Sequence, residues 1–508
     1  MPPGIITFIA QKDGYGVPAG NPYANSALIK RGGDIFIAGG NSAAASARLI
    51  TFSCTSAGVF GAAQIAIDVE AAFATSTDFC KVVDGIYLGF GGIPDGVHGS
   101  NKMAAYTIPV DAAGNIGAVI STQDIDVGLG YFRFYTWRGM YKRATGVYVV
   151  CYNNDVGAGN PTATALTTFA VSDAGAITPG FIGRHAFNSA VTTTKQALAD
   201  LGNGYCALTY MTWPGLQLNV KTALIDVAGT ITDIADVTLD TTVCDSAANH
   251  PYVPFLVPLR GPYYYALVYS VNQTLIIKTL KIVNGIITVL STTNVGALLG
   301  NWGSEYGLSG AFYIPDNILV LTWQSSDDAA NIKIRTYNIT PNGILGSMLD
   351  SQITATIRFY STEIVQHSGS TFVFTGANHA APEQLRADSF DIGLGPIVLP
   401  TVETDPATGV NYHVATLNGL LDSDGGDACN CWLNWGQTPT MGNIINFGIQ
   451  YTGFSYASNL AGLASGTTYY FQAFASSSVG TVAGALLSFT TPSALNFKVV
   501  TLPATNIY

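Results

Sequence analysis

The sequence contains few charged side chains. Asp, Glu, Lys and Arg make up 10% of the 508 residues, whereas they make up about a quarter of an ordinary globular protein. The 21 basic residues are outnumbered by 32 acidic ones, which gives a formal net charge of −11. A nucleic-acid-binding surface needs clustered Lys and Arg, so this composition argues against nucleic acid as a partner. A surface with so few charges suits a protein that stays inside a large assembly or faces the outside of a cell.

Long hydrophobic runs are also missing. Apolar stretches break well before the roughly 20 residues that a membrane-spanning helix needs, so we expect no membrane span. The start of the chain, MPPGIITFIAQKDGYG, has neither a basic segment nor a long apolar core, so we expect no signal peptide. A display protein without an export signal can leave the cell inside a particle, as virion proteins do.

Cysteine is scarce and odd in number. The seven cysteines are Cys54, Cys80, Cys151, Cys206, Cys244, Cys429 and Cys431. Most lie in apolar runs, where a cysteine packs as a small apolar side chain. The pair at 429 and 431 is too close for a favourable disulfide within one strand, and it lacks the second pair of ligands that a zinc site needs. We therefore expect free thiols, no metal, and synthesis in a reducing host cytoplasm.

Catalytic motifs are missing as well. The chain has no G-x-S-x-G elbow, no phosphate-binding loop, and no convincing Ser/His/Asp set, and its six histidines lack ligand spacing. We therefore expect a protein that is not an enzyme. A pair of carboxylates that hydrolyses a glycosidic bond needs no sequence motif, so a glycoside hydrolase or a lactonase stays open as an alternative.

What the sequence does contain is a repeated hairpin, seen in ITFSCTSAGVFG and YTIPVDAAGNIG. The turn glycines of the seven copies are Gly58, Gly114, Gly175, Gly229, Gly285, Gly343 and Gly395. Successive differences between these positions are 56, 61, 54, 56, 58 and 52 residues. One supersecondary unit copied at a near-constant interval of this size is typical of a repeat architecture.

Each repeat predicts one sheet of four antiparallel strands. In the second repeat, four runs of strand length are separated by turn residues: 81–85, 86–92, 103–110 and 116–125. The turn glycine supplies a positive φ that a Cβ would oppose. Polar residues beside the glycines suit the same turn: Asp111, Asp173, Asn284 and Asn342. We predict an all-β fold in which residues 17–399 form a seven-bladed β-propeller. Residues 1–16 are either a strand that closes the ring or an arm that docks on a neighbouring subunit.

A second domain is predicted where the repeat stops, because residues 400–492 have the length of one β-sandwich. The segment 463–473, LASGTTYYFQA, resembles the fibronectin type III signature, although Ser465 stands where that family usually has proline. The resemblance implies that Tyr469 is the corner tyrosine of a β-sandwich that serves in spacing, adhesion or display. It also implies a core tryptophan, which is Trp432 or Trp435.

The last segment, residues 493–508, carries one charge, at Lys498. We expect it to be a tail that could dock as an extra strand on the sheet edge of a neighbour.

Aromatic residues gather in the loops that should share one face of the ring. The candidates for a ligand-binding face are Tyr131, Phe134, Tyr135, Trp137, Trp213, Trp302, Tyr306, Trp323 and Tyr360. Flat rings beside polar side chains suit a sugar face or a protein partner. The alternative is that these rings plug the central channel or pack between blades.

One acidic loop is a candidate for calcium, the only cofactor that the sequence suggests. Asp422, Asp424 and Asp427 lie on a glycine-bent loop that offers the hard oxygen ligands Ca²⁺ prefers. The spacing is compressed relative to an EF-hand loop, and no bidentate Glu follows. An ordinary solvated loop is the alternative interpretation.

Taken together, the propeller hairpins, the fibronectin-like segment, the low charge and the missing export signal resemble virion proteins of tailed bacteriophages. Tail fibres, baseplate propellers and capsid-decorating fibres are members of that class. The resemblance implies a structural virion protein with copies of itself and other virion proteins as partners, and with a host-surface glycan or receptor as a further partner. A bacterial surface adhesin or carbohydrate-binding protein, extracellular or on the cell surface, is the alternative.

Overall fold

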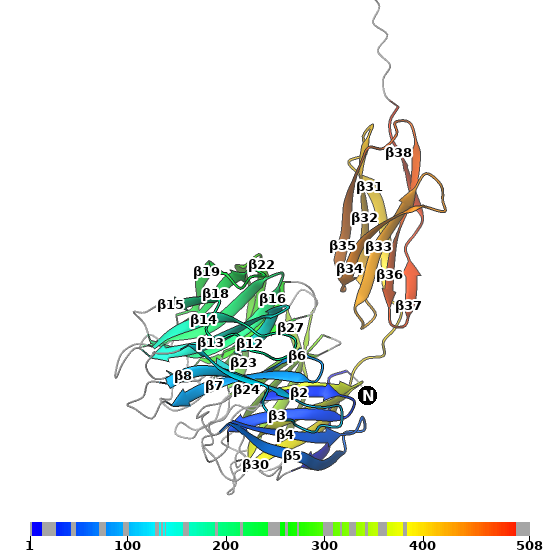
Figure 1. The fold of residues 1–508 in the computed structure, drawn as a ribbon. Coiled ribbons are helices and arrows are strands. Elements are labelled where there is room, and N and C mark those ends of the chain that lie inside the picture. Colours follow the sequence, from blue (N-terminus) through cyan, green and yellow to red (C-terminus); the bar gives the residue numbers. More distant parts are fainter. Residues whose placement is uncertain are drawn as a thin grey trace, which may run out of the picture. The chain divides into compact units, whose positions relative to one another are not determined.

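The computed structural model describes residues 3–12, 27–41, 47–70, 78–94, 101–126, 132–133, 136–137, 139–155, 162–187, 192–213, 217–241, 254–259, 263–271, 274–297, 308–314, 317–324, 332–340, 344–353, 363–378 and 384–493. The chain divides into two compact units, Met1–Leu394 and Gly395–Tyr508 (Figure 1). Both units consist of β-strands joined by turns throughout the described residues, so the protein is all-β as predicted.

The described part of the first unit contains seven sheets, each built on four antiparallel strands. Sheet 1 contains β2 (Ala27–Gly32), β3 (Ile35–Asn41), β4 (Ala47–Cys54) and β5 (Phe60–Glu70). Sheet 2 contains β6 (Asp78–Val83), β7 (Ile86–Pro94), β8 (Asn101–Pro109) and β9 (Ser121–Asp126). Sheet 3 contains β12 (Met140–Ala144), β13 (Val147–Asp155), β14 (Thr162–Ala170) and β15 (Gly183–Phe187), with the short β10 (Phe132–Arg133) added.

The remaining sheets repeat this order. Sheet 4 contains β16 (Thr192–Gly202), β17 (Tyr205–Trp213), β18 (Leu218–Ile225) and β19 (Ile231–Asp240), with the short β11 (Thr136–Trp137) added. Sheet 5 contains β20 (Phe255–Pro258), β21 (Tyr264–Val271), β22 (Thr274–Val283) and β23 (Ile286–Ala297). Sheet 6 contains β24 (Leu308–Ile314), β25 (Ile318–Gln324), β26 (Ile332–Ile339) and β27 (Leu345–Ile353). Sheet 7 contains β28 (Glu363–Ser368), β29 (Thr371–Asn378), β30 (Gln384–Ile392) and β1 (Ile6–Lys12).

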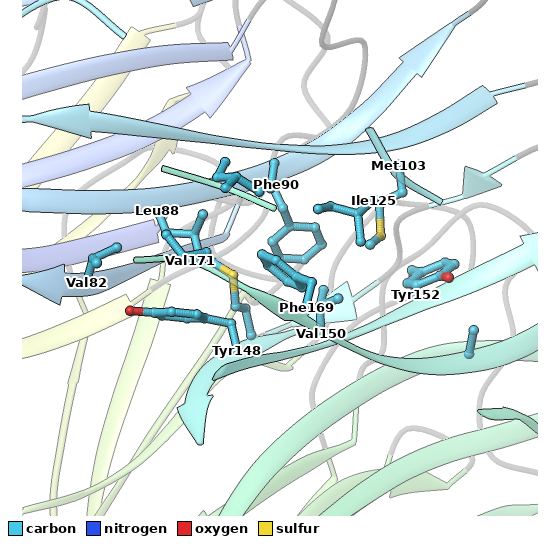
Figure 2. Packing of buried hydrophobic residues seen from close by; sticks show 14 residues of the cluster. Val82, Leu88, Phe90, Met103, Ile125, Tyr148, Val150, Tyr152, Phe169 and Val171 are labelled. Carbon is cyan, nitrogen blue, oxygen red and sulfur yellow. The ribbon is translucent and has the colours of Figure 1, made fainter. Parts of the chain in front are cut away.

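The sheets stand in a closed circle, because the first strand of each sheet contacts the first strand of the next and β28 of sheet 7 contacts β2 of sheet 1. This arrangement is that of a β-propeller. Apolar side chains fill the space between neighbouring sheets. Figure 2 shows the cluster between sheets 2 and 3, where Phe90 and Met103 pack with Tyr148 and Phe169. Each sheet is thus apolar on both faces, which explains the nearly continuous hydrophobic runs of the second strands.

Sheet 7 is completed by the N-terminal strand, which pairs antiparallel with β30 from Ile6↔Ile392 to Lys12↔Ala387. Our prediction of a seventh hairpin turn at Gly395 is wrong, because β30 is followed by no partner strand and the chain enters the second unit there. Gly4 takes that position instead. Its φ is +79° and its N–H donates to the Gly393 carbonyl at 2.7 Å, as in a hairpin whose connection is missing.

The turn glycines also join neighbouring sheets. Gly58, Gly114, Gly175, Gly229 and Gly285 all have φ between +78° and +93°, whereas the predicted Gly343 lies outside the described residues. A buried hydroxyl on the third strand of one sheet donates to the glycine carbonyl of the next. The pairs are Thr51 to Gly114, Thr107 to Gly175, Thr168 to Gly229, Thr222 to Gly285, Thr336 to Gly4 and Ser389 to Gly58. Gly4 therefore fills the turn position in its bonding as well as in its conformation.

A second polar contact stabilises the hairpin turns from within. Asp111 accepts hydrogen bonds from the backbone N–H groups of Ala113 and Asn115 at 2.9 and 2.8 Å. In the sheet 3 hairpin, Ser172 fills the corresponding place, whereas the predicted Asp173 lies 3.9 Å from Lys142 Nζ in an ion pair. The predicted Asn342 lies beyond the described ranges.

The second unit contains two sheets packed face to face. One sheet contains β31 (Thr401–Thr408), β32 (Val414–Ser423) and β35 (Phe454–Ala461). The other contains β34 (Asn443–Gln450), β33 (Cys429–Gly436), β36 (Thr468–Ser477) and β37 (Gly480–Ala483), with β38 (Leu487–Thr490) also paired to β36. Alternating residues of β33 and β36 enter one shared core, among them Leu433 and Phe471.

The structure separates the two candidate tryptophans and gives Tyr469 a backbone partner. Trp435 packs against the core, with its ring 6.1 Å from that of Tyr469, whereas Trp432 lies on the opposite side of the sheet. The Tyr469 hydroxyl accepts a hydrogen bond from the Ala464 N–H at 2.9 Å. This bond ties the start of β36 to the turn before it, which is the geometry of a corner tyrosine.

Candidate functional site

The predicted aromatic face of the ring falls largely outside the described residues. Those outside are Tyr131, Phe134, Tyr135, Trp302, Tyr306 and Tyr360. Trp137, Trp213 and Trp323 lie in β11, β17 and β25, of which the structure describes the backbone at these positions. A ligand-binding role for this set therefore stays a prediction.

The backbone of Trp137 lies in a short strand that is added to sheet 4. The short β11 pairs parallel with β16, through Trp137↔Ala197, and β16 is one of the first strands that contact one another around the circle. The neighbouring β10 pairs with β13 of sheet 3 through Phe132↔Asn154. The segment therefore bridges two sheets, with Trp137 at the inner edge of sheet 4. From the sequence this residue was expected in a loop, because two-residue strands carry no periodicity.

The three carboxylates of the acidic loop point to separate partners. Asp424 is buried and accepts from the N–H groups of Gly426 and Thr452 at 3.2 and 3.1 Å. Asp427 accepts from the Ser478 N–H at 2.9 Å, and Asp422 accepts from the Thr401 hydroxyl at 3.3 Å. These bonds hold the loop between β32 and β33 in place. Calcium binding here stays a prediction.

Titratable side chains elsewhere in the described residues meet in pairs and small groups. Asp233 lies 3.0 Å from His185 Nε2 and 2.8 Å from Lys221 Nζ, across sheets 3 and 4. Arg386 and Asp388 are fully buried and lie 2.8 Å apart on β30. No group of three or more His, Cys, Asp or Glu residues within the described ranges could hold a metal ion. The same ranges contain no helix long and apolar enough to cross a membrane.

Six cysteines belong to the described residues and none of these six forms a disulfide. Five of them are buried and Cys80 is half-buried. Burial raises the pKa of the Cys54 thiol to about 12, and it does the same to Cys206. Such thiols pack as apolar groups and make poor nucleophiles. The seventh, Cys244, lies outside the described ranges.

One surface of the second unit has the character of a binding site. Cross-strand partners in an antiparallel pair lie on the same face, and Leu433 and Ala473 are partners that point into the core. The residues on either side of them therefore face outwards, and Trp432 and Phe474 are such a pair. We call this surface the neutral face and define it by Asn430, Trp432, Asn434, Ile444, Ile449, Tyr470, Gln472, Phe474 and Ser476.

The centre of the neutral face is an aromatic stack. The rings of Trp432 and Phe474 are parallel within 5°, with centroids 5.3 Å apart. That separation between nearly parallel rings is typical of an offset stack, and both side chains are half-buried. Ile444 and Ile449 on the neighbouring strand β34 are 69% and 58% exposed. This sheet therefore presents apolar surface to solvent in a unit that already has a filled core.

The polar members of the neutral face are amides and hydroxyls. Asn434 lies directly opposite Gln472, and Asn430 lies opposite Ser476, on either side of the aromatic stack. Gln472 Nε2 donates to the Gly484 carbonyl at 2.7 Å, which fixes the orientation of its side chain and leaves the amide oxygen to accept. Gln472 is thus held in a fixed position beside the rings, whereas the Asn434 amide oxygen is buried.

The absence of charge extends beyond this face. The sequence has no Asp, Glu, Lys, Arg or His between Asp427 and Lys498, a stretch that includes all five strands of this sheet. Sequence reasoning missed the site because it weighed aromatic residues in loops of the ring. The signal was present: Asn430, Trp432 and Asn434 alternate with apolar core residues, which predicts one outward face on β33.

Comparisons with known proteins give matches among solved structures alone. No family model matches the chain, and no curated protein matches it. Among solved structures, a fungal alcohol oxidase of the AA5 family, in complex with copper, is 10% identical with a TM-score of 0.45, over 96% of this chain and 99% of that one. The Dos1 propeller is 8% identical with a TM-score of 0.39, over 77% of this chain and 96% of that one. The sensor domain of the anti-sigma factor RsgI4 of Pseudobacteroides cellulosolvens is 16% identical with a TM-score of 0.16, over 20% of this chain and 100% of that one. These likenesses concern the fold alone and carry no argument about function.

Proposed function

We propose that the first unit is a seven-bladed β-propeller and that the second is a fibronectin type III-like module. The circle of sheets and the exchange of Gly4 for a turn glycine support the first part. The two sheets of the second unit and the Tyr469 contact to Ala464 support the second part.

The protein serves, in this proposal, as a non-enzymatic structural component of a tailed-bacteriophage virion, as a tail fibre, baseplate or capsid-decorating protein. The observation that carries the proposal is that the polar side chains repeated from sheet to sheet bond to the neighbouring sheet. Hydroxyls such as those of Thr168 and Thr222 are buried and bonded to the next sheet, so the repeat serves to hold the ring together. A repeat devoted to its own architecture is typical of a scaffold.

The low charge of the whole chain supports the same role. With 53 charged residues, 21 basic and 32 acidic, in 508, the protein has little charge to keep it dispersed as a free monomer. A protein whose surface is buried against copies of itself or other particle proteins does not need that charge to stay dispersed.

The experiment is a search for the protein in purified particles. Phage particles from the host of this gene are banded by density, and the bands are probed with an antibody raised against the recombinant chain. We expect the protein to co-migrate with the infectious band and to resist removal by high salt. Its presence in the cell envelope or culture medium, with none in particles, would contradict the virion role and favour the adhesin.

A further inference from the structure

We infer that the neutral face of the second unit binds an uncharged polysaccharide, with the sugar rings lying against Trp432 and Phe474. The inference goes beyond the proposed structural role, and it does not depend on a virion location. It assigns the glycan to the second unit rather than to the aromatic residues of the ring that the sequence singled out.

Charge is the first argument. A partner that carried charges would have to strip water from them against a sheet that offers no opposite charge, and the lost hydration would not be repaid. Nucleic acids carry a charge on every phosphate, so they fit this face poorly. A neutral polyol has no charge to desolvate.

The chemistry of the face is the second argument. A pyranose ring has an apolar side of C–H groups, which packs on an aromatic ring, and a rim of hydroxyls that donate and accept hydrogen bonds. The neutral face has aromatic rings at its centre, where the C–H groups would pack, and amide and hydroxyl side chains on both sides, where the sugar hydroxyls would lie. The Trp432–Phe474 stack lies at the centre, Asn434 and Gln472 lie on one side of it, and Asn430 and Ser476 lie on the other. Amides can both donate and accept, as hydroxyl partners require.

Shape is the third argument. The face is a row of cross-strand pairs on one sheet, so it is extended along the strands rather than closed around a single molecule. The exposed Ile444 and Ile449 widen the apolar strip beyond the stack. Such a surface suits a chain of sugar units, and repeated weak contacts with a chain add up through multivalency.

The experiment is affinity electrophoresis of the full-length protein in gels that contain one polysaccharide. The neutral probes are dextran, a soluble β-glucan and a galactomannan, and dextran sulfate is the charged counterpart of the first. We expect at least one neutral probe to retard the protein. Trp432→Ala should weaken that binding about tenfold, which corresponds to about 1.4 kcal/mol.

Two further variants separate binding from folding. Asn430→Glu leaves the aromatic stack in place and adds a charge beside it, so it should weaken binding by a similar factor. Tyr412→Ala removes an aromatic residue of the same unit that is 36% exposed and lies outside the neutral face, and its retardation should match the unchanged protein within about twofold. Each variant is checked by thermal unfolding before its binding is compared.

Several outcomes would overturn the inference. It fails if none of the three neutral probes retards the protein, if Trp432→Ala is retarded as strongly as the unchanged protein, or if dextran sulfate binds more tightly than dextran. Self-association that Trp432→Ala abolishes would identify a second copy as the occupant instead. A protein that is found in particles but not retarded contradicts this inference alone. A retarded protein that is absent from particles contradicts only the virion role.

Discussion

The two units of this chain differ in where one set of polar side chains lies. In the first unit, hydroxyls such as Thr168 Oγ1 are buried and join one sheet to the next. In the second unit, the amides beside Trp432 lie on an outer sheet face, next to exposed isoleucines. The repeated hydroxyls of the first unit thus serve its own architecture, whereas the amides beside Trp432 lie outside the core of the second unit. We infer that recognition belongs to the second unit.

The units also differ in how far apart in sequence their stabilising contacts lie. Sheet 7 needs a strand from the opposite end of the unit, with Ile6 opposite Ile392 and the Ile6 N–H bonded to Asp350 at 2.9 Å. The core of the second unit lies entirely between Val402 and Phe489. Loop closure over several hundred residues costs more entropy than closure over less than a hundred. The first unit should therefore be the more vulnerable to damage at its ends.

Removal of residues 1–12 should have the largest effect. It takes away the outer strand of sheet 7, the buried side chain of Ile6 and the acceptor of the Thr336 hydroxyl. The loss should be on the order of 5 kcal/mol or more, which is a large part of the stability of most domains. Calorimetry should show the transition of the first unit lost or strongly lowered and the transition of the second unaltered. If the truncated chain melts as the full one does, ring closure by β1 is not what stabilises the first unit.

Phe471→Ala should produce the opposite pattern. Phe471 is fully buried in the core of the second unit, and such a cavity costs about 3–5 kcal/mol. The second unit alone should be destabilised, as measured by denaturant unfolding followed at both transitions. Val479→Ala, at a position 46% exposed in the same unit, serves as the control and should change stability by less than about 0.5 kcal/mol. An equal fall in both transitions would mean that the units do not unfold independently.

Gly229→Val should destabilise the first unit by about 1–3 kcal/mol. The φ of Gly229 is +93°, and a Cβ there would lie 3.1–3.2 Å from Ile182 and the Thr168 hydroxyl. Gly180→Val is the matched control, since Gly180 has φ +80° and no atom within 4 Å of an added Cβ. The difference between the two variants measures the contact between sheets, apart from backbone strain. Equal losses would leave backbone strain as the whole effect.

The smallest expected effect is on how the stability of the first unit depends on pH. The Thr230 N–H donates to Asp226 Oδ1 at 2.8 Å and holds the pKa of that carboxyl below its ordinary value. Since the folded pKa is the lower one, this contribution to stability is fully present above the unfolded pKa of about 3.9 and is lost as the pH falls through the folded pKa. Asp226→Ser, which copies the turn that Ser172 makes in sheet 3, should remove that part of the acid sensitivity. A carboxyl titration by NMR that gives Asp226 an ordinary or raised pKa would contradict the assignment.

Much of the ring could be predicted from the sequence, because each hairpin is a local feature. Gly58 to Gly285 could be located, since a tight turn with a positive φ needs glycine. The last turn could not, because the interval between glycines says nothing about which strand completes a sheet. Gly395 fits the interval, yet Gly4 occupies the turn position, from the other end of the unit.

The binding surface was harder to predict for a different reason. Aromatic residues in loops attract attention, but loops have no periodicity from which a shared face follows. Trp432 stands on a strand, where alternation with Cys431 and Leu433 does determine its direction. The missing information was which alternate positions on β36 lie beside it, and that register follows only from the paired structure.

Hydrogen exchange with and without the neutral polysaccharide tests most directly whether the second unit, and not the first, binds the polysaccharide. The full-length protein is exchanged free and in the presence of whichever neutral probe retards it, and protection is read peptide by peptide. The account predicts added protection in peptides that contain Trp432 or Phe474, with the peptides of the first unit unchanged. Protection in the first unit, or none at Trp432, would contradict it.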